Sequence, residues 1–98
     1  MIKDYFKKRK NYKILKKIIE ANPRKNFKHS ENYMDFKNHG CEGIWDQFII
    51  NNLTFYFYIN LTQEVWTYGV IKNNEEVNLT YSQSESLFEL IKNKKINL

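Results

Sequence analysis

The chain has 98 residues, of which 42% are hydrophobic and 16% aromatic, and its formal net charge is +5. A chain of this length buries about 60–65% of its unfolded surface, which suffices for one hydrophobic core and therefore one domain. It has no apolar run near the roughly 20 residues of a membrane helix, no apolar segment typical of a signal peptide, and a single cysteine, Cys41, so no internal disulfide. We therefore expect an intracellular, cytoplasmic globular protein that does not enter a membrane.

The positive charge is concentrated at one end of the chain. Residues 1–28 hold eleven of the 16 Lys and Arg and only two acids, a local net charge of +9, whereas residues 29–98 have a net charge of −4. Lys, Asn and Ile together supply 38 residues, which is typical of an AT-rich coding genome and makes the total lysine content weak evidence. That bias does not explain the clustering, which indicates a negatively charged partner.

The first predicted element is a basic amphipathic helix within residues 1–22. Apolar side chains recur on one face at the helical period, with Ile14 at the edge of the stripe. The helix ends at Asn22-Pro23, because the residue before a proline is driven away from helical geometry. The apolar stripe consists of Tyr12, Leu15, Ile18 and Ile19.

Residues 23–43 have two interpretations. Ser30 can cap a short helix that ends near Gly40. Alternatively, the segment is an ordered loop that Phe27, Tyr33 and Phe36 attach to the core.

Residues 44–81 predict a four-stranded antiparallel meander, because short apolar-alternating runs are separated by turn residues such as Asn51-Asn52. In the clearest run, 53–61, the odd positions face the helices and the even positions, Tyr56 and Tyr58 among them, face the other way. The remaining strands are expected at 44–50, 64–72 and 77–81.

Residues 82–98 predict a second helix. Ser82 and Glu85 have the spacing of a capping box, and Leu87, Phe88 and Ile91 lie on one apolar face. The fold class is therefore α+β, with an N-terminal basic helix, an antiparallel meander, and a C-terminal helix that packs on the sheet.

The basic helix and the turn after it form the first candidate binding site. Lysines along one arc of a helix can displace counterions from nucleic acid, which gives salt-sensitive affinity without sequence readout. The alternative is a solvated outer face of a core-packed helix. With two Arg in the whole chain, base-specific readout is not expected. The candidate residues are Lys7, Lys8, Arg9, Lys10, Lys13, Lys16, Lys17, Arg24 and Lys25.

Aromatic side chains of the sheet form the second candidate site. Tyr56, Tyr58, Trp66 and Tyr68 could stack on bases or anchor a protein partner. The alternative is cross-strand packing that stabilises the sheet.

We predict no metal, cofactor or catalytic residue. His29, His39 and Cys41 give three ligands at best, and a carboxylate such as Glu42 or Asp46 would have to complete a site. No pair of carboxylates, phosphate-binding loop or nucleophile motif is recognisable.

The sequence therefore favours a small non-enzymatic binding protein. The first hypothesis is docking of the basic helix on nucleic acid, on a nucleoprotein or on an acidic protein surface. The second is a protein-binding inhibitor or regulator, of the kind encoded by mobile elements or immunity systems, that acts through the aromatic face or an edge strand.

Overall fold

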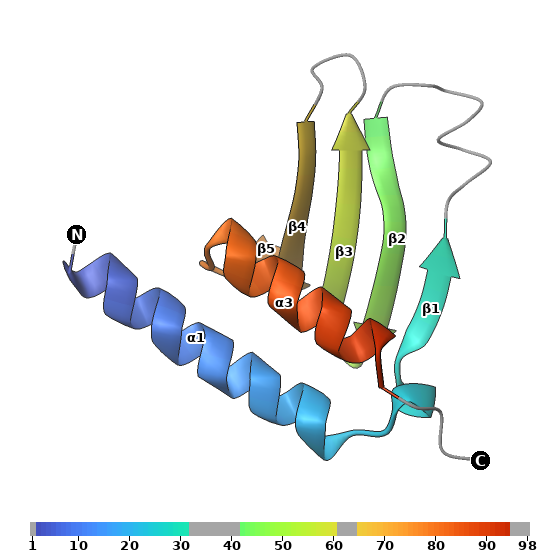
Figure 1. Ribbon diagram of the computed structural model, residues 1–98, viewed down its shortest axis with the longest axis horizontal. Helices are drawn as coiled ribbons and strands as arrows, with labels where there is room; N and C mark the ends of the chain where they lie inside the picture. Colours follow the sequence, from blue (N-terminus) through green and yellow to red (C-terminus); the bar gives the residue numbers. More distant parts are fainter. Residues whose placement is uncertain (1, 32–41, 61–64, 95–98) are drawn as a thin grey trace.

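A computed structural model describes residues 2–31, 42–60 and 65–94, which form an antiparallel sheet flanked in sequence by two helices (Figure 1). The α+β fold predicted from the sequence is confirmed. The sheet has five strands, in the order in which they occur in the chain. The elements are α1 (Ile2–Ala21), η1 (Arg24–Asn26), β1 (Lys28–Glu31), β2 (Glu42–Ile50), β3 (Leu53–Asn60), β4 (Val65–Lys72), β5 (Glu75–Glu76) and α3 (Tyr81–Lys92).

Helix α1 forms where the sequence predicts it and turns the predicted stripe toward the core. Leu15 and Ile19 are buried, and Tyr12 and Ile18 pack against them. The helix stops at Ala21, immediately before Asn22 and Pro23, because a proline at this point restricts the backbone of its predecessor.

Tight turns built from asparagine join β2 to β3 and β4 to β5. Ile50 pairs with Leu53 across a two-residue turn in which Asn51 has φ +51°. Asn73 and Asn74, with φ of +51° and +66°, make the turn from β4 to β5. Asparagine suits both turns, because it tolerates the left-handed region better than most residues. The side chain of Asn52 donates to Asn73 Oδ1 at 2.9 Å and so links the two turns.

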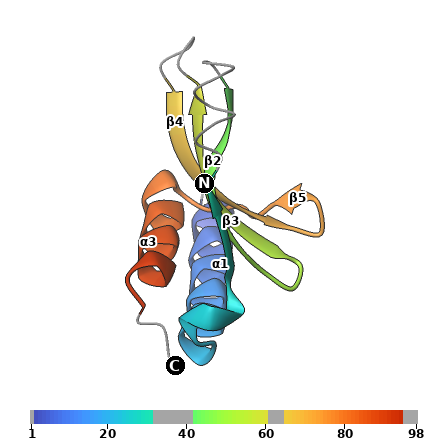
Figure 2. The same cartoon turned by 90° about the vertical axis from the view of Figure 1, so that its right-hand side faces the viewer.

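The two faces of the sheet differ in what covers them. One face, which we call the helix face, packs against α3, and α1 lies beside α3 (Figure 2). Its residues form a continuous core with both helices, and burying each large apolar side chain contributes roughly 1.5–3 kcal/mol. The fully buried side chains of that core are Ile19, Phe48, Phe55, Val70, Leu87 and Ile91.

The opposite face, which we call the open face, has neither helix packed against it. Tyr56 and Tyr58 point to this side, as the alternation of β3 predicts, because their neighbours Phe55 and Phe57 belong to the core side.

The structure corrects the prediction for residues 23–43. Ser30 does not cap a helix, because Lys28–Glu31 forms edge strand β1 and pairs with β2. Phe27 is buried, as the loop interpretation requires. The rest of the proposed short helix, with Tyr33 and Phe36, lies outside the described residues.

The prediction for the last strand of the meander is also wrong. The last strand is the two-residue β5, and residues 77–80, which were expected to form a strand, connect it to α3. Val77 and Leu79 still pack against the core, and Val77 N donates to Val70 O of β4 at 2.8 Å, so the apolar alternation reflects burial of an extended segment that bonds to the sheet at its start.

Helix α3 begins at Tyr81, which is earlier in the chain than a cap at Ser82 predicts. Thr80, and not Ser82, is the N-cap: its hydroxyl accepts from Gln83 N at 3.1 Å, and Gln83 Oε1 accepts from Thr80 N at 2.9 Å. This capping box leaves Ser82 inside the first turn. The helix ends at Lys92, and residues 95–98 of the predicted helix lie outside the described residues.

Beyond α3, Lys94 joins the two helices. Its Nζ donates to the backbone carbonyls of Ile19 and Asn22 at the end of α1. Ile19 O also accepts from Asn22 N at 3.3 Å, and the ammonium group adds a second donor there and opposes the negative end of the helix dipole. Among the described residues, neither helix offers an uncharged apolar stretch long enough to cross a membrane.

Candidate functional sites

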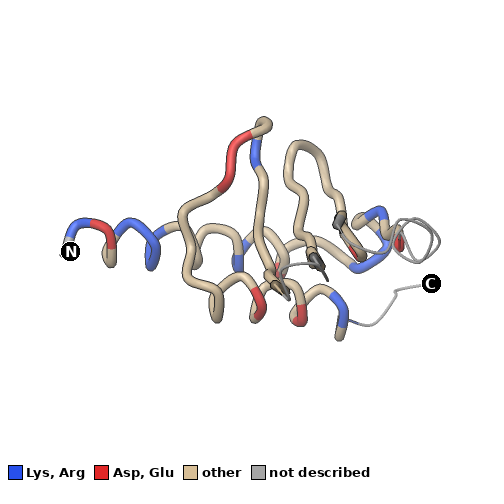
Figure 3. Tube along the Cα trace, turned by 90° about the horizontal axis from the view of Figure 1, so that it is seen from above, with Lys and Arg blue, Asp and Glu red and all other residues tan. Residues whose placement is uncertain are grey.

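Six of the nine predicted basic residues project from α1 into solvent. Blue segments recur along the N-terminal part of the chain in Figure 3. We call this set of exposed cations the basic face: Lys7, Arg9, Lys10, Lys13, Lys16 and Lys17.

Two apolar side chains interrupt the basic face. Phe6 is 58% exposed and Ile14 47% exposed. Together with four cations they line a shallow surface groove of about 420 Å³, whose lining residues are Phe6, Arg9, Lys10, Lys13, Ile14 and Lys17. No acidic side chain lines this groove, which therefore offers positive charge and apolar surface to the same ligand.

Lys8 does not belong to the basic face. It is half-buried, and its Nζ lies 3.1 Å from Asp4 Oδ2. Asn78 donates to the other oxygen of Asp4 at 2.6 Å. This hydrogen bond, followed by that from Lys8, holds the pKa of Asp4 below its usual value. Lys8 thus pairs with an acid of its own helix, and the hydrogen bond from Asn78 to that acid attaches the start of α1 to the segment before α3.

Arg24 and Lys25 lie beyond the helix, in η1. The guanidinium of Arg24 sits over the ring of Phe48, 4.5 Å from its centroid, and Arg24 is half-buried. The cation–π interaction with this ring stabilises the guanidinium in that position. Lys25 is exposed and extends the positive charge past the end of α1.

The four predicted aromatic residues do not share a face. Trp66 pairs with Ile59 and Tyr68 pairs with Phe57, which places both on the helix side of the sheet. Tyr68 packs against Phe57 and Phe88, with centroids 4.7 and 5.2 Å apart, so it stabilises the core. Trp66 is 59% exposed.

Tyr56 and Tyr58 lie on the open face, but they do not form a flat aromatic surface on which bases could stack. Tyr56 is only 7% exposed. Its ring covers Gly69, its cross-strand partner, where a Cβ atom would collide with it. Its hydroxyl donates to Glu76 of β5. Burial, followed by the hydrogen bond to Glu76, raises the pKa of Tyr56 above its usual value.

The open face is hollowed beside these tyrosines. A shallow cavity of about 390 Å³ lies there, lined by Ile44, Tyr56, Tyr58, Thr67, Ile71 and Glu76. The lining is mainly apolar, with Glu76 as its charged group.

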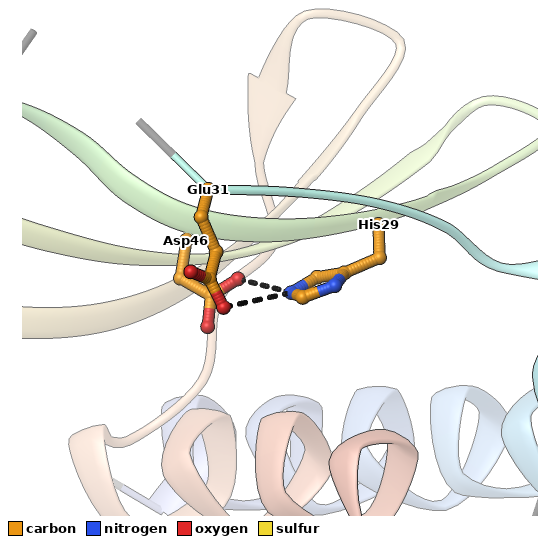
Figure 4. Close-up of side chains that lie close together, drawn as sticks. All are labelled: His29, Glu31 and Asp46. Atoms are coloured by element: carbon orange, nitrogen blue, oxygen red, sulfur yellow. Dashed lines mark hydrogen bonds and ion pairs between the residues drawn. The ribbon is translucent and has the colours of Figure 1, made fainter. Parts of the chain in front are cut away.

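A third group of side chains comes together at the β1 edge of the helix face. His29, Glu31 and Asp46 meet there (Figure 4). Each offers one ligand atom, and these three atoms lie within 4.8 Å of one another. His29 Nε2 lies 2.6 Å from Asp46 Oδ1 and 3.8 Å from Glu31 Oε1. We call these three residues the His29 cluster.

The register of the sheet explains why these residues meet. Glu31 pairs with Asp46, and His29 pairs with Phe48, two residues further along the same face of β2. A β-bulge lies between Ile44 and Asp46. It turns Ile44 to the open face and Asp46 to the helix face, where Asp46 is 8% exposed.

The sequence indicated His29 and Asp46 as possible metal ligands but not Glu31. It grouped His29 with His39 and Cys41, which lie outside the described residues. A signal existed in the alternation of His29 and Glu31, since residues two apart share a face of a strand. This alternation indicates a shared face only if residues 28–31 are known to form a strand.

Negatively charged side chains lie near Tyr68 on the helix face. Burial, followed by the charges of Glu89 and Glu85 and a smaller contribution from Asp46, raises the pKa of Tyr68.

Comparison of the chain with models of protein families, with curated proteins and with solved structures gave no match.

Proposed function

We propose that the chain is a non-enzymatic, intracellular nucleic-acid-binding protein that docks the basic face of α1 on the phosphate backbone. The observation that carries the proposal is the groove on α1, where Arg9, Lys10, Lys13 and Lys17 are exposed together and no acid intervenes.

The spacing of these cations supports contact with a linear polyanion. Residues three and four apart on a helix are neighbours, about 5–6 Å apart at their Cβ atoms. Lys10, Lys13 and Lys17 therefore form one row along the helix axis. The opposite side of α1 is fixed to the protein by Leu15 and Ile19, so the row is held in place without using its charges.

Such binding would be dominated by counterion release. Each phosphate neutralised on duplex DNA steepens the dependence of log K on log salt by about 0.9. The scarcity of arginine and the absence of any acceptor in the groove favour backbone contact over reading of bases. The ligand class is then nucleic acid of any sequence, free or within a nucleoprotein.

The experiment is fluorescence anisotropy with random-sequence single-stranded RNA, single-stranded DNA and duplex DNA, from 25 to about 300 mM salt. The variant Lys10→Gln/Lys13→Gln/Lys17→Gln should lower affinity and reduce the duplex salt slope by about 2 to 3. The matched control, Lys28→Gln/Lys72→Gln/Lys92→Gln, removes the same charge from exposed positions elsewhere and should retain most of the affinity.

Two results would reject the proposal. One is the absence of binding to all three probes at 25 mM salt. The other is an equal loss of affinity in both triple variants, which would reduce the effect to overall charge.

A second candidate function is binding of a protein partner at the hollow of the open face. The observation that favours it is the mainly apolar cavity beside Tyr56 and Tyr58. Tyr58→Ala should then weaken capture of a candidate partner without altering nucleic-acid affinity. Retained capture in that variant would argue against the open face.

A further inference from the structure

The His29 cluster contains more negative charge than its histidine can balance. Two carboxylates, Glu31 and Asp46, point to the same ring nitrogen, His29 Nε2. A single N–H donates well to one acceptor, and here Asp46 at 2.6 Å takes that position. Glu31 Oε1, at 3.8 Å from the same nitrogen, is left with the weaker contact beside a second carboxylate.

No other cation balances these groups among the described residues. The ion pairs found in residues 2–31, 42–60 and 65–94 give Glu31 and Asp46 no partner besides His29. Asp46 is 8% exposed, and burial of a carboxylate is unfavourable unless a positive charge or several hydrogen bonds compensate it.

The histidine is held rigidly in the orientation that the cluster needs. Its ring stacks on Phe48, with centroids 4.4 Å apart and planes 17° apart. Phe48 is itself fully buried and packs against Phe88 on α3. Asp46 is directed to the same point by the β-bulge that precedes it, and bulges commonly re-aim side chains in this way.

We propose that the His29 cluster binds a divalent transition-metal ion, of which Zn²⁺ is the best fit, through His29 Nε2 and one oxygen each of Asp46 and Glu31. The ion takes the place of the proton between Nε2 and Oδ1 and neutralises the excess carboxylate. Imidazole favours zinc and its neighbours over magnesium and calcium, which select oxygen ligands.

The distances within the cluster suit such an ion after small adjustments. With metal–ligand bonds of about 2.0–2.2 Å, neighbouring ligand atoms lie roughly 3–4 Å apart. The 2.6 Å pair must open slightly and the 3.8 Å pair already falls in range. Glu31 is exposed on an edge strand, so its side chain can move toward the ion without disturbing the core. Three protein ligands leave one position for water or another small ligand.

The test is isothermal titration of the full chain with Zn²⁺, with Mg²⁺ as the comparison ion. All proteins carry His39→Gln and Cys41→Ser, so that these two possible ligands contribute nothing. The expected result is one Zn²⁺ per chain and no saturable Mg²⁺ binding. His29→Gln and Asp46→Asn should each weaken Zn²⁺ binding by at least about 10-fold, the lower end of what loss of a supporting group produces.

Two controls separate loss of a ligand from loss of the fold. Glu31→Gln changes an exposed side chain and should also weaken binding about 10-fold. Glu75→Gln, an equal change of charge on exposed β5, should leave affinity unchanged. Circular dichroism of each ion-free variant verifies folding. If the substitutions at His29 and Asp46 prevent folding, Glu31→Gln against Glu75→Gln decides the question.

The proposal is overturned if Zn²⁺ does not bind saturably below about 1 mM, or if affinity is the same with and without the cluster substitutions. Either outcome leaves nucleic-acid binding by α1 untouched, because the basic face and the His29 cluster share no residue.

Discussion

Tyr56 is held on the open face because the residue opposite it has no side chain. Its ring covers Gly69, and its hydroxyl reaches Glu76 on the next hairpin. A tyrosine so placed joins three strands, β3, β4 and β5, through one side chain. It is therefore a structural residue first, and the more exposed Tyr58 is the better probe of any ligand on this face.

This arrangement predicts a pH-dependent contribution of Tyr56 to stability. Tyr56→Phe should lower the free energy of unfolding near pH 7 by about 1 kcal/mol through loss of one hydrogen bond. The pKa of Tyr56 is raised in the folded state. The folded state therefore favours the protonated hydroxyl. This contribution is fully present below the usual pKa near 10, declines above it, and is lost as pH rises through the raised pKa of the folded state.

Urea unfolding of both proteins between pH 7 and pH 11 provides the measurement. The difference in unfolding free energy between wild type and Tyr56→Phe should shrink above about pH 10. A difference that stays constant over this range would show that folding does not raise the pKa of Tyr56.

At the scale of elements, the predictable parts are those whose apolar residues recur with a clear period. The stripe of α1 and the alternation of β3 each place a whole face correctly, because burial of that face dominates the energy of the element. Strand β1 has no such pattern: all four of its residues are exposed, and its pairing with β2 supplies the order. A polar edge strand leaves no periodic signal, so the His29 cluster that depends on it could not be assembled from the sequence.

The start of α3 was ambiguous for a different reason. Thr80 with Gln83 and Ser82 with Glu85 both have capping-box spacing, and local sequence does not choose between them. The structure has the Thr80 pair, in which the Thr80 hydroxyl accepts from Gln83 N and Gln83 Oε1 accepts from Thr80 N.

The choice of cap can be measured. Thr80→Ala should lower the free energy of unfolding by about 1 kcal/mol, because Gln83 N loses its acceptor. Ser82→Ala should change it by no more than about 0.5 kcal/mol, since alanine is favourable inside a helix. Chemical denaturation of the two variants gives both values, and a larger effect at Ser82 would contradict the assigned cap.

Over the whole molecule, the two proposed sites use different faces and different charges. The basic face is on the solvent side of α1, while the His29 cluster lies at the β1 edge of the sheet, on the face that α3 covers. Charge is thus segregated in space as well as in sequence. The amino-acid composition revealed the first site, whereas the second depends on contacts between residues seventeen apart.

The link between the two helices predicts a global effect of one lysine. Lys94→Ala removes the donors to the carbonyls of Ile19 and Asn22 and should lower the free energy of unfolding by about 1 to 2 kcal/mol. Lys92→Ala, in the exposed last turn of α3, should change it by less than about 0.5 kcal/mol.

Hydrogen exchange can localise the effect. In Lys94→Ala, amides in the last turn of α1 should exchange faster, since the carbonyls there lose the hydrogen bonds from Lys94. Unchanged protection at residues 18–22 would indicate that the carbonyls find other partners.

The position of Lys94 also bears on how the protein is made. This lysine is translated 75 residues after Ile19, whose carbonyl it satisfies. At typical elongation rates the ribosome needs roughly 4 to 15 s to cover that distance. During that interval α1 lacks both its donor Lys94 and helix α3, against which it packs. The most strongly charged part of the chain is therefore the part that waits longest for its final partner, close to the RNA of the machine that synthesises it.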